Sequence, residues 1–180
     1  MAFSRTLELR VQDCHLVLRA REGDQDAVAR LIERHRVGLI KVSANILRDP
    51  SEAEDVAQEA FLKVFNQLSA LRDDQGFKRY LYQIAVRLCI DRMRRIRPEP
   101  QSDIREGATK REDIESRVHI ERVLAKLPTD LRTTLVLREI EELDYSEIAD
   151  ILEIPVGTVR SRLHSARERF RALWMDEVFS

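Results

Sequence analysis

The chain has 180 residues, which is enough for one large domain or two small ones. Hydrophobic residues make up 43% and charged residues 35%, with only five glycines and five prolines, so we expect an almost wholly helical protein. Cys14 and Cys89 are single and far apart, which argues against a zinc site or a disulfide framework, and no cofactor is indicated. With no signal peptide and no long apolar run, we expect a cytoplasmic protein without membrane insertion.

The net charge of −1 conceals a strongly uneven distribution along the chain. Between residues 139 and 153 there are seven acidic residues and no Lys or Arg, whereas residues 156–171 hold five arginines against Glu168 alone. Because phosphate responds to local charge, the basic segment is a candidate for nucleic-acid binding in spite of the net charge.

We expect a weakly ordered lead-in over residues 1–13 and a first helical domain over residues 14–97. Asp24, which follows Gly23, is the expected N-cap of the second helix in this domain. Asp49-Pro50-Ser51 is expected to end this helix and to cap the next, which runs from about Glu52 to Leu71, with Glu54 three residues after Ser51 as in a capping box.

The helix over residues 52–71 has a continuous apolar stripe on one side. Its opposite face carries Asp55, Gln58, Glu59 and Leu62. A large apolar residue surrounded by acids and an amide is typical of a docking face for another protein, although a single exposed leucine is also common on ordinary surfaces.

The pattern of residues 77–97 predicts another helix, in which basic residues are interleaved with aromatic ones. Such a composition suits single-stranded nucleic acid, because bases stack on rings while cations follow the backbone. An amphipathic helix with tyrosines at the edge of its core explains the same pattern. The candidate binding residues are Lys78, Arg79, Tyr80, Tyr82, Gln83 and Arg87.

Prolines 98 and 100 begin a linker over residues 98–111, and a second helical domain follows over residues 112–180. This domain is expected to be a four-helix module that ends in a helix-turn-helix over residues 145–169, with its turn at residues 153–155. The outward face of the last helix carries Arg160, Ser161 and His164, with Thr158, Arg162 and Ser165 nearby. Such a face suits a major groove, although an ordinary helical hairpin with a solvated basic face fits it too.

Three segments in this order resemble the extracytoplasmic-function sigma factors, which are small two-domain specificity subunits of bacterial RNA polymerase. The segments are DVAQEAFLKVF at 55–65, FKRYLYQIAVRLCIDRMRR at 77–95, and the stretch from LPTDLRTT to ARERFR at 127–171. The resemblance implies an all-α fold of two small helical domains joined by a flexible linker.

The resemblance also implies partners and roles for the helix faces described above. The partners would be core RNA polymerase, through its clamp and flap regions, then promoter DNA and an anti-sigma factor. Asp55, Gln58, Glu59 and Leu62 would dock on the clamp. Lys78, Arg79, Tyr80, Tyr82, Gln83 and Arg87 would meet the −10 element. Arg160, Ser161, Arg162 and His164 would read the −35 element, with Thr158 and Ser165 near phosphates. Catalysis would stay with the polymerase, so the chain would be no enzyme and would take no small-molecule substrate.

The chain departs from the usual family pattern at four of these positions. Tyr80 stands where tryptophan is usual, Arg87 where asparagine is usual, Glu153 where glycine is common in the turn, and Ser165 where arginine is frequent. The base preference at each promoter element is therefore not implied by the resemblance.

The main alternative is a helix-turn-helix regulator that binds duplex operators without polymerase. That alternative leaves residues 51–97 unexplained. An adaptor that binds only protein leaves the basic face of the last helix unexplained, and an enzyme has the least support.

Overall fold

The computed structural model describes residues 2–71, 76–95 and 111–179, and these residues form helices and connecting turns without a β-strand. The N-terminal module contains α1 (Ala2–Arg21), α2 (Gln25–Leu47), α3 (Pro50–Asn66), a short 3₁₀ helix η1 (Leu68–Ala70) and α4 (Phe77–Arg95). The C-terminal module contains α5 (Arg111–Lys126), α6 (Thr129–Glu139), α7 (Tyr145–Leu152) and α8 (Val156–Phe179). The all-α, two-module prediction is therefore confirmed, and most of the predicted linker lies outside the described residues.

The prediction for the N-terminus is wrong, because α1 begins at Ala2 rather than near Cys14. Residues 2–13 include no glycine or proline and are rich in good helix formers, so helical propensity continues through them although their apolar pattern is weak. Helix α2 is capped by Asp24 as predicted, since its carboxylate accepts from the N–H groups of Asp26 and Ala27.

The predicted start of α3 is also wrong. Its N-cap is Asp49, whose carboxylate accepts from the N–H groups of Ser51 and Glu52 at 2.9 and 3.1 Å. Pro50 then occupies the first helical turn, where its missing N–H costs nothing. The helix ends at Asn66 instead of Leu71, and η1 follows it.

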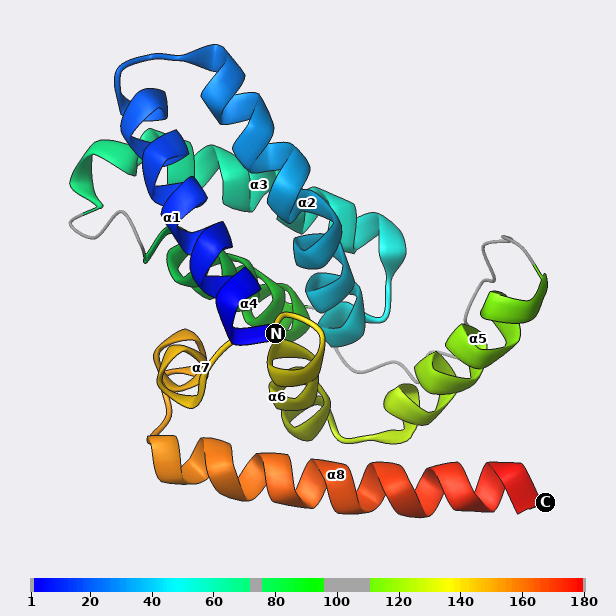
Figure 1. Cartoon of the computed structure of the whole chain (residues 1–180). Helices are drawn as coiled ribbons and strands as arrows, with labels where there is room; N and C mark the ends of the chain where they lie inside the picture. The colour runs from blue at the N-terminus through cyan, green and yellow to red at the C-terminus, as the bar shows by residue number, and fades with distance from the viewer. Residues whose placement is uncertain (1, 72–75, 96–110, 180) are drawn as a thin grey trace.

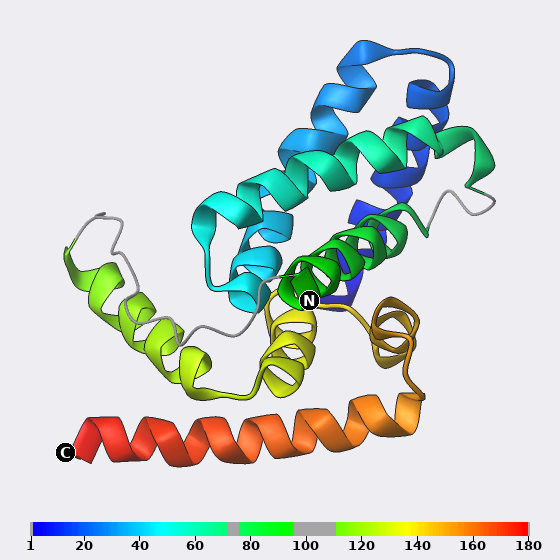
Figure 2. The same ribbon diagram turned by 180° about the vertical axis from the view of Figure 1, so that it is seen from behind.

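The two modules pack against each other, which the helical periodicity of the sequence does not indicate. In Figure 1, α8 lies along one side of the molecule, and α6 and α7 lie between it and the bundle of α1–α4. Helix α6 contacts α2, and α7 contacts α4 as well as α8, an arrangement that Figure 2 shows from behind. One apolar core therefore continues from α1–α4 into α6–α8.

Candidate nucleic-acid interface

The polar face of α3 points to solvent, as the helical pattern predicts. Asp55 and Gln58 are exposed, and Leu62 keeps 65% of its surface exposed in the middle of this face. Glu59 pairs with Lys63 at 3.0 Å and with Arg92 of α4 at 3.2 Å. The hydrogen bond from Lys63 lowers the pKa of Glu59, partial burial opposes that shift, and Arg92 adds to it. This face therefore presents an exposed leucine among polar and acidic side chains.

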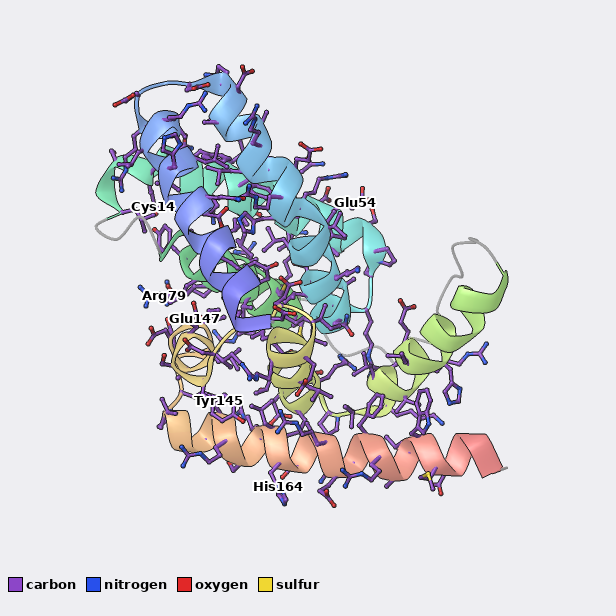
Figure 3. All side chains as sticks on the ribbon, in the orientation of Figure 1. Cys14, Glu54, Arg79, Tyr145, Glu147 and His164 are labelled. Atoms are coloured by element: carbon purple, nitrogen blue, oxygen red, sulfur yellow. The ribbon has the colours of Figure 1, made fainter. Side chains whose placement is uncertain are left out.

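Five of the six candidate residues of α4 contact the C-terminal module, although Arg87 stays exposed, and the sixth, Tyr80, does not. Lys78 Nζ donates to the main-chain oxygen of Glu141 at 2.7 Å and lies 3.3 Å from its carboxylate. Arg79 pairs with Asp150 of α7 at 3.1 Å, and Figure 3 places Arg79 where α4 and α7 meet. Three further contacts of this kind join Gln83 Nε2 to the Asp150 main-chain oxygen (3.2 Å), Arg87 to Glu153, and Tyr82 to Glu141.

The two tyrosines of α4 differ in their surroundings. Tyr82 is 1% exposed, and its hydroxyl donates to the Glu141 carboxylate. Burial raises its pKa, and the negative charge of Glu141 raises it further, so the hydroxyl stays a donor. Tyr80 is half-buried, and its hydroxyl donates to the side-chain oxygen of Gln67. Tyr82 therefore belongs to the core in this arrangement, whereas part of the Tyr80 ring reaches the surface.

The helix-turn-helix forms at α7 and α8, as predicted. Asp144 caps α7 in a capping box with Glu147, in which each side chain accepts a hydrogen bond from the main-chain N–H of the other residue. Glu153 ends α7 with φ 55° and ψ 43°, the left-handed conformation that usually favours glycine. Helix α8 then buries Val159, Leu163 and Ala166 against the module.

The opposite face of α8 is open to solvent. Arg160, Ser161, His164 and Ser165 are exposed, and His164 points away from the rest of the molecule in Figure 3. Thr158 and Arg162 lie at the margins and are half-buried, with Arg162 Nε 3.5 Å from the Asp130 carboxylate. Ser161 Oγ donates to the main-chain oxygen of Thr158 at 3.0 Å. The sequence pattern and the structure thus agree on one exposed basic face.

A groove of about 570 Å³ opens between α5, α6 and α8. Its wall is mainly apolar and aromatic, and Glu139, Arg167 and Arg171 also line it. Arg167 pairs with Glu139 at 2.6 Å, and this hydrogen bond raises the pKa of the arginine in spite of partial burial. The apolar residues that line the groove are Ile120, Leu124, Leu135, Val136, Ile140, Phe170 and Trp174.

Sequence reasoning missed four residues that decide the environment of α4. The sequence pattern marks Glu141 and Asp150 only as members of an acidic segment, and Glu153 also as a departure from the family pattern in the turn, yet each contacts α4. Gly38 of α2 is the fourth, because an added Cβ there would lie 2.5 Å from both Glu141 Oε1 and the Tyr82 hydroxyl. The complementary charge of residues 77–97 and 139–153 was a signal for this contact.

Comparisons with known proteins decide which family has these features. Residues 31–98 match the model of Sigma-70 region 2, and residues 117–170 match Sigma-70, region 4. The RNA polymerase sigma-H factor of Pseudomonas aeruginosa is 37% identical over 177 residues, covering 87% of this chain and 91% of that protein. The ECF RNA polymerase sigma factor SigW of Bacillus subtilis is 32% identical, covering 89% of this chain and 95% of its relative. The chain is an extracytoplasmic-function sigma factor.

Solved structures match both modules together. CnrH, in complex with the cytosolic domain of CnrY, matches with a TM-score of 0.70 and 25% identity over 90% of this sigma factor and 96% of CnrH. The sigma factor RpoE of Bartonella quintana, in complex with the anti-sigma factor NepR, matches with a TM-score of 0.68 and 19% identity. That match covers 81% of this sigma factor and 94% of RpoE, and it supports the fold.

Extracytoplasmic-function sigma factors are transcription initiation factors that bind core RNA polymerase and promoter DNA. Sigma factors are in general not enzymes. Within the described ranges, no group of His, Cys, Asp and Glu side chains is arranged to hold a metal ion. None of the described helices has the length and apolarity that a bilayer crossing requires.

Proposed function

We propose that this sigma factor binds the polymerase clamp through α3, the opened −10 element through α4 and the −35 element through α8. The observation that carries the proposal is that these three faces occur in family order, on elements whose opposite sides are buried. No catalytic group is needed in the chain, because bond formation stays with the polymerase. Its place of action would be the cytoplasm, where bacterial polymerase works.

The proposed clamp-binding residues are Asp55, Gln58, Glu59 and Leu62. Burying the exposed Leu62 side chain would contribute about 1.5–3 kcal/mol. The acids and the amide around it would fix the orientation, since rim charges mainly set specificity and association rate.

Lys78, Arg79, Tyr80, Tyr82, Gln83 and Arg87 are proposed to meet the −10 element. In an opened promoter the non-template strand would be held by cations along its backbone and by stacking, worth about 1–3 kcal/mol per base. Of the two tyrosines, Tyr80 is the more accessible for stacking in this arrangement, because it is half-buried whereas Tyr82 is buried. Arg87 would approach the base that leaves the stack.

Arg160, Ser161, Arg162 and His164 are proposed to read the −35 element from the major groove, with Thr158 and Ser165 near phosphates. Arginine pairs well with guanine edges, and a good bidentate pair gives about 1–3 kcal/mol of discrimination. The apolar groove of α5, α6 and α8 is proposed to take an amphipathic helix of the polymerase flap, because it lies away from the exposed face of α8.

An anti-sigma factor is proposed to control the protein. Two structural relatives were solved as complexes, and one of their partners is an anti-sigma factor. A pull-down from the native cell tests this proposal. Constitutive transcription with no inhibitory partner recovered would contradict it.

The main test is run-off transcription with core polymerase over a pooled promoter library. We expect discrete starts that depend on this sigma factor and that disappear with Asp55→Arg plus Leu62→Asp. Glu22→Arg is the control, because Glu22 is exposed in the turn after α1 and the substitution reverses a charge as Asp55→Arg does. Sequence-specific duplex binding by the protein alone, with no starts, would favour the operator-binding regulator.

A further inference from the structure

Arg92 differs in its surroundings from other basic residues of α4. Its side chain is 22% exposed, whereas the side chain of Arg94 is 78% exposed. The proposed DNA-binding side of α4 includes Arg79, Gln83 and Arg87, which recur every four residues. Arg92 follows Arg87 by five residues and therefore lies about 140° around the helix from it. The two arginines thus project from different sides of α4.

The guanidinium of Arg92 joins two acids of α3. Its Nη1 donates to the Glu52 carboxylate at 2.5 Å and to the Glu52 main-chain oxygen at 3.0 Å. Its Nη2 donates to the Glu59 carboxylate at 3.2 Å. Partial burial lowers the pKa of Arg92, but the hydrogen bonds and charges of Glu52 and Glu59 outweigh it and raise the pKa overall. The two acids lie about two helical turns apart, and the planar fork of an arginine suits such a bridge better than a lysine does.

Glu59 is held from two sides. Its Oε1 lies 3.0 Å from Lys63 Nζ on the same helix, and its Oε2 accepts from Arg92 at 3.2 Å. The Glu59 side chain nevertheless keeps 40% of its surface exposed. Leu62, the exposed leucine of the α3 face, lies one turn further along. A carboxylate that is fixed before docking loses less conformational entropy on binding, so this geometry prepares Glu59 for a partner.

We propose that Arg92 is a positioning residue for polymerase docking, which orients Glu59 on the α3 face and does not hold promoter DNA. This inference rests on the proposed function, because it takes α3 as the clamp-binding face. Helix α4 then serves both partners, since one of its sides would meet the −10 element while another supports α3, against which it packs. Arg92 acts through Glu59 and needs no contact with the polymerase itself.

The test measures the affinity of full-length variants for core RNA polymerase, by anisotropy of a dye on the N-terminal amine. Arg92→Gln should bind core polymerase about three- to tenfold more weakly, a modest loss because Glu59 is partly exposed. Arg94→Gln is the matched control, since it removes the same charge from an exposed side chain of α4. It should change the affinity by less than about twofold. Arg92→Lys keeps the charge but not the fork, so it should recover part of the affinity.

A double-mutant cycle separates positioning from a purely structural role. Glu59→Gln removes the carboxylate that Arg92 orients, so in this background Arg92→Gln should weaken core binding by less than about twofold. An equal loss in both backgrounds would show that Arg92 acts on the fold and not through Glu59, and it would overturn the inference. Circular dichroism monitors folding. If Arg92→Gln is unfolded at the assay temperature, Arg92→Lys replaces it in both backgrounds, and the same two results decide.

The salt dependence of promoter binding tests the opposite assignment, in which Arg92 contacts a phosphate. Holoenzyme is assembled with saturating sigma factor, so that its affinity for core polymerase does not limit the result. Loss of one phosphate contact reduces the slope of log K against log salt by about 0.7–0.9. We expect Arg92→Gln to leave this slope unchanged, and a reduction of that size would overturn the inference.

Failure of this inference can be told apart from failure of the proposed function. Asp55→Arg plus Leu62→Asp is measured in the same core-binding assay. If that double variant loses core binding while Arg92→Gln binds like the wild type, the inference is overturned and the proposed α3 docking face stands. If the double variant binds core polymerase normally, the docking face itself is wrong, and the inference falls with it.

Discussion

A buried acid–histidine pair between α1 and α2 should contribute substantially to the stability of the N-terminal module. Asp13 and His35 have side chains that are each 7% exposed, and His35 Nε2 lies 2.8 Å from the Asp13 carboxylate. Arg34 donates to the other carboxylate oxygen at 2.6 Å but keeps 28% of its side chain exposed. The perturbation we consider is Asp13→Ala.

The expected magnitude follows from the exposure of the two partners. The Arg34 guanidinium is solvated by water when Asp13 is removed. The Asp13–Arg34 ion pair should therefore contribute less than about 1 kcal/mol to the free energy of unfolding. His35 is buried and loses its partner, which costs about 1.5–3 kcal/mol. Asp13→Ala should therefore lower the free energy of unfolding by about 2–3 kcal/mol. Arg34→Ala is the matched control and should lower it by less than about 1 kcal/mol.

The assay is urea unfolding followed by circular dichroism at pH 7 and at acid pH. Burial raises the pKa of Asp13, but the bonds and charges of His35 and Arg34 outweigh it, so the net pKa is lowered from 3.8. The folded state thus favours the ionised carboxylate, and its stabilisation is present above pH 3.8 and lost as the pH falls through the folded-state pKa. The difference between wild type and Asp13→Ala should therefore shrink at acid pH. If Asp13→Ala and Arg34→Ala lowered the free energy of unfolding equally, the reasoning would be refuted. Such a result would mean that leaving the buried His35 without its partner has no extra cost.

Two further predictions concern α8 and the thiols. Arg160→Ala should weaken −35 binding by holoenzyme about 5- to 150-fold in competition gel shifts, whereas Arg169→Ala, exposed further along α8, should change it little. Burial raises the pKa of the Cys89 thiol to about 11, so alkylation at pH 8 should modify Cys89 only in urea. Because the folded state holds that proton more tightly, this site should also destabilise the fold as the pH rises from about 9 to 11. Rapid modification of Cys89 in the native protein, measured by mass spectrometry, would contradict its burial.

The sequence predicts the helices and their outward faces well, because both depend on local spacing. The apolar stripe of α3 places Leu62 outside, and the structure leaves it exposed. The break at Gly23 and the cap at Asp24 are also local signals, and both are confirmed. The error at Ser51 has a local cause too, since Asp49 followed by Pro50 is a stronger start than the capping box beyond it.

The contact between the modules could not be predicted in the same way. It joins α4 to residues more than 50 positions further along the chain. In the sequence, each of the residues that make these contacts is an ordinary charged residue of an amphipathic helix or a loop. Two departures from the family pattern, Arg87 and Glu153, contact each other in the structure. Glu153 adopts the left-handed conformation expected of the usual glycine, and its carboxylate then reaches α4. Helical periodicity carries no information about such a pairing.

The roles of individual residues in binding remain predictions. Tyr82 illustrates why, because the sequence pattern groups it with Tyr80 as a stacking residue although the structure buries it beside Glu141. The assignment of Tyr82 to the −10 element therefore stays a prediction.

The most direct test of the central claim is permanganate footprinting on a promoter recovered from the run-off library. Permanganate oxidises unpaired thymines, so it reports strand opening itself. The account predicts reactive thymines near the start site only when core polymerase and this sigma factor are both present. It also predicts their loss with Asp55→Arg plus Leu62→Asp, but not with Glu22→Arg. A duplex that stays unreactive with both proteins present, although the sigma factor alone binds it specifically, would contradict the account.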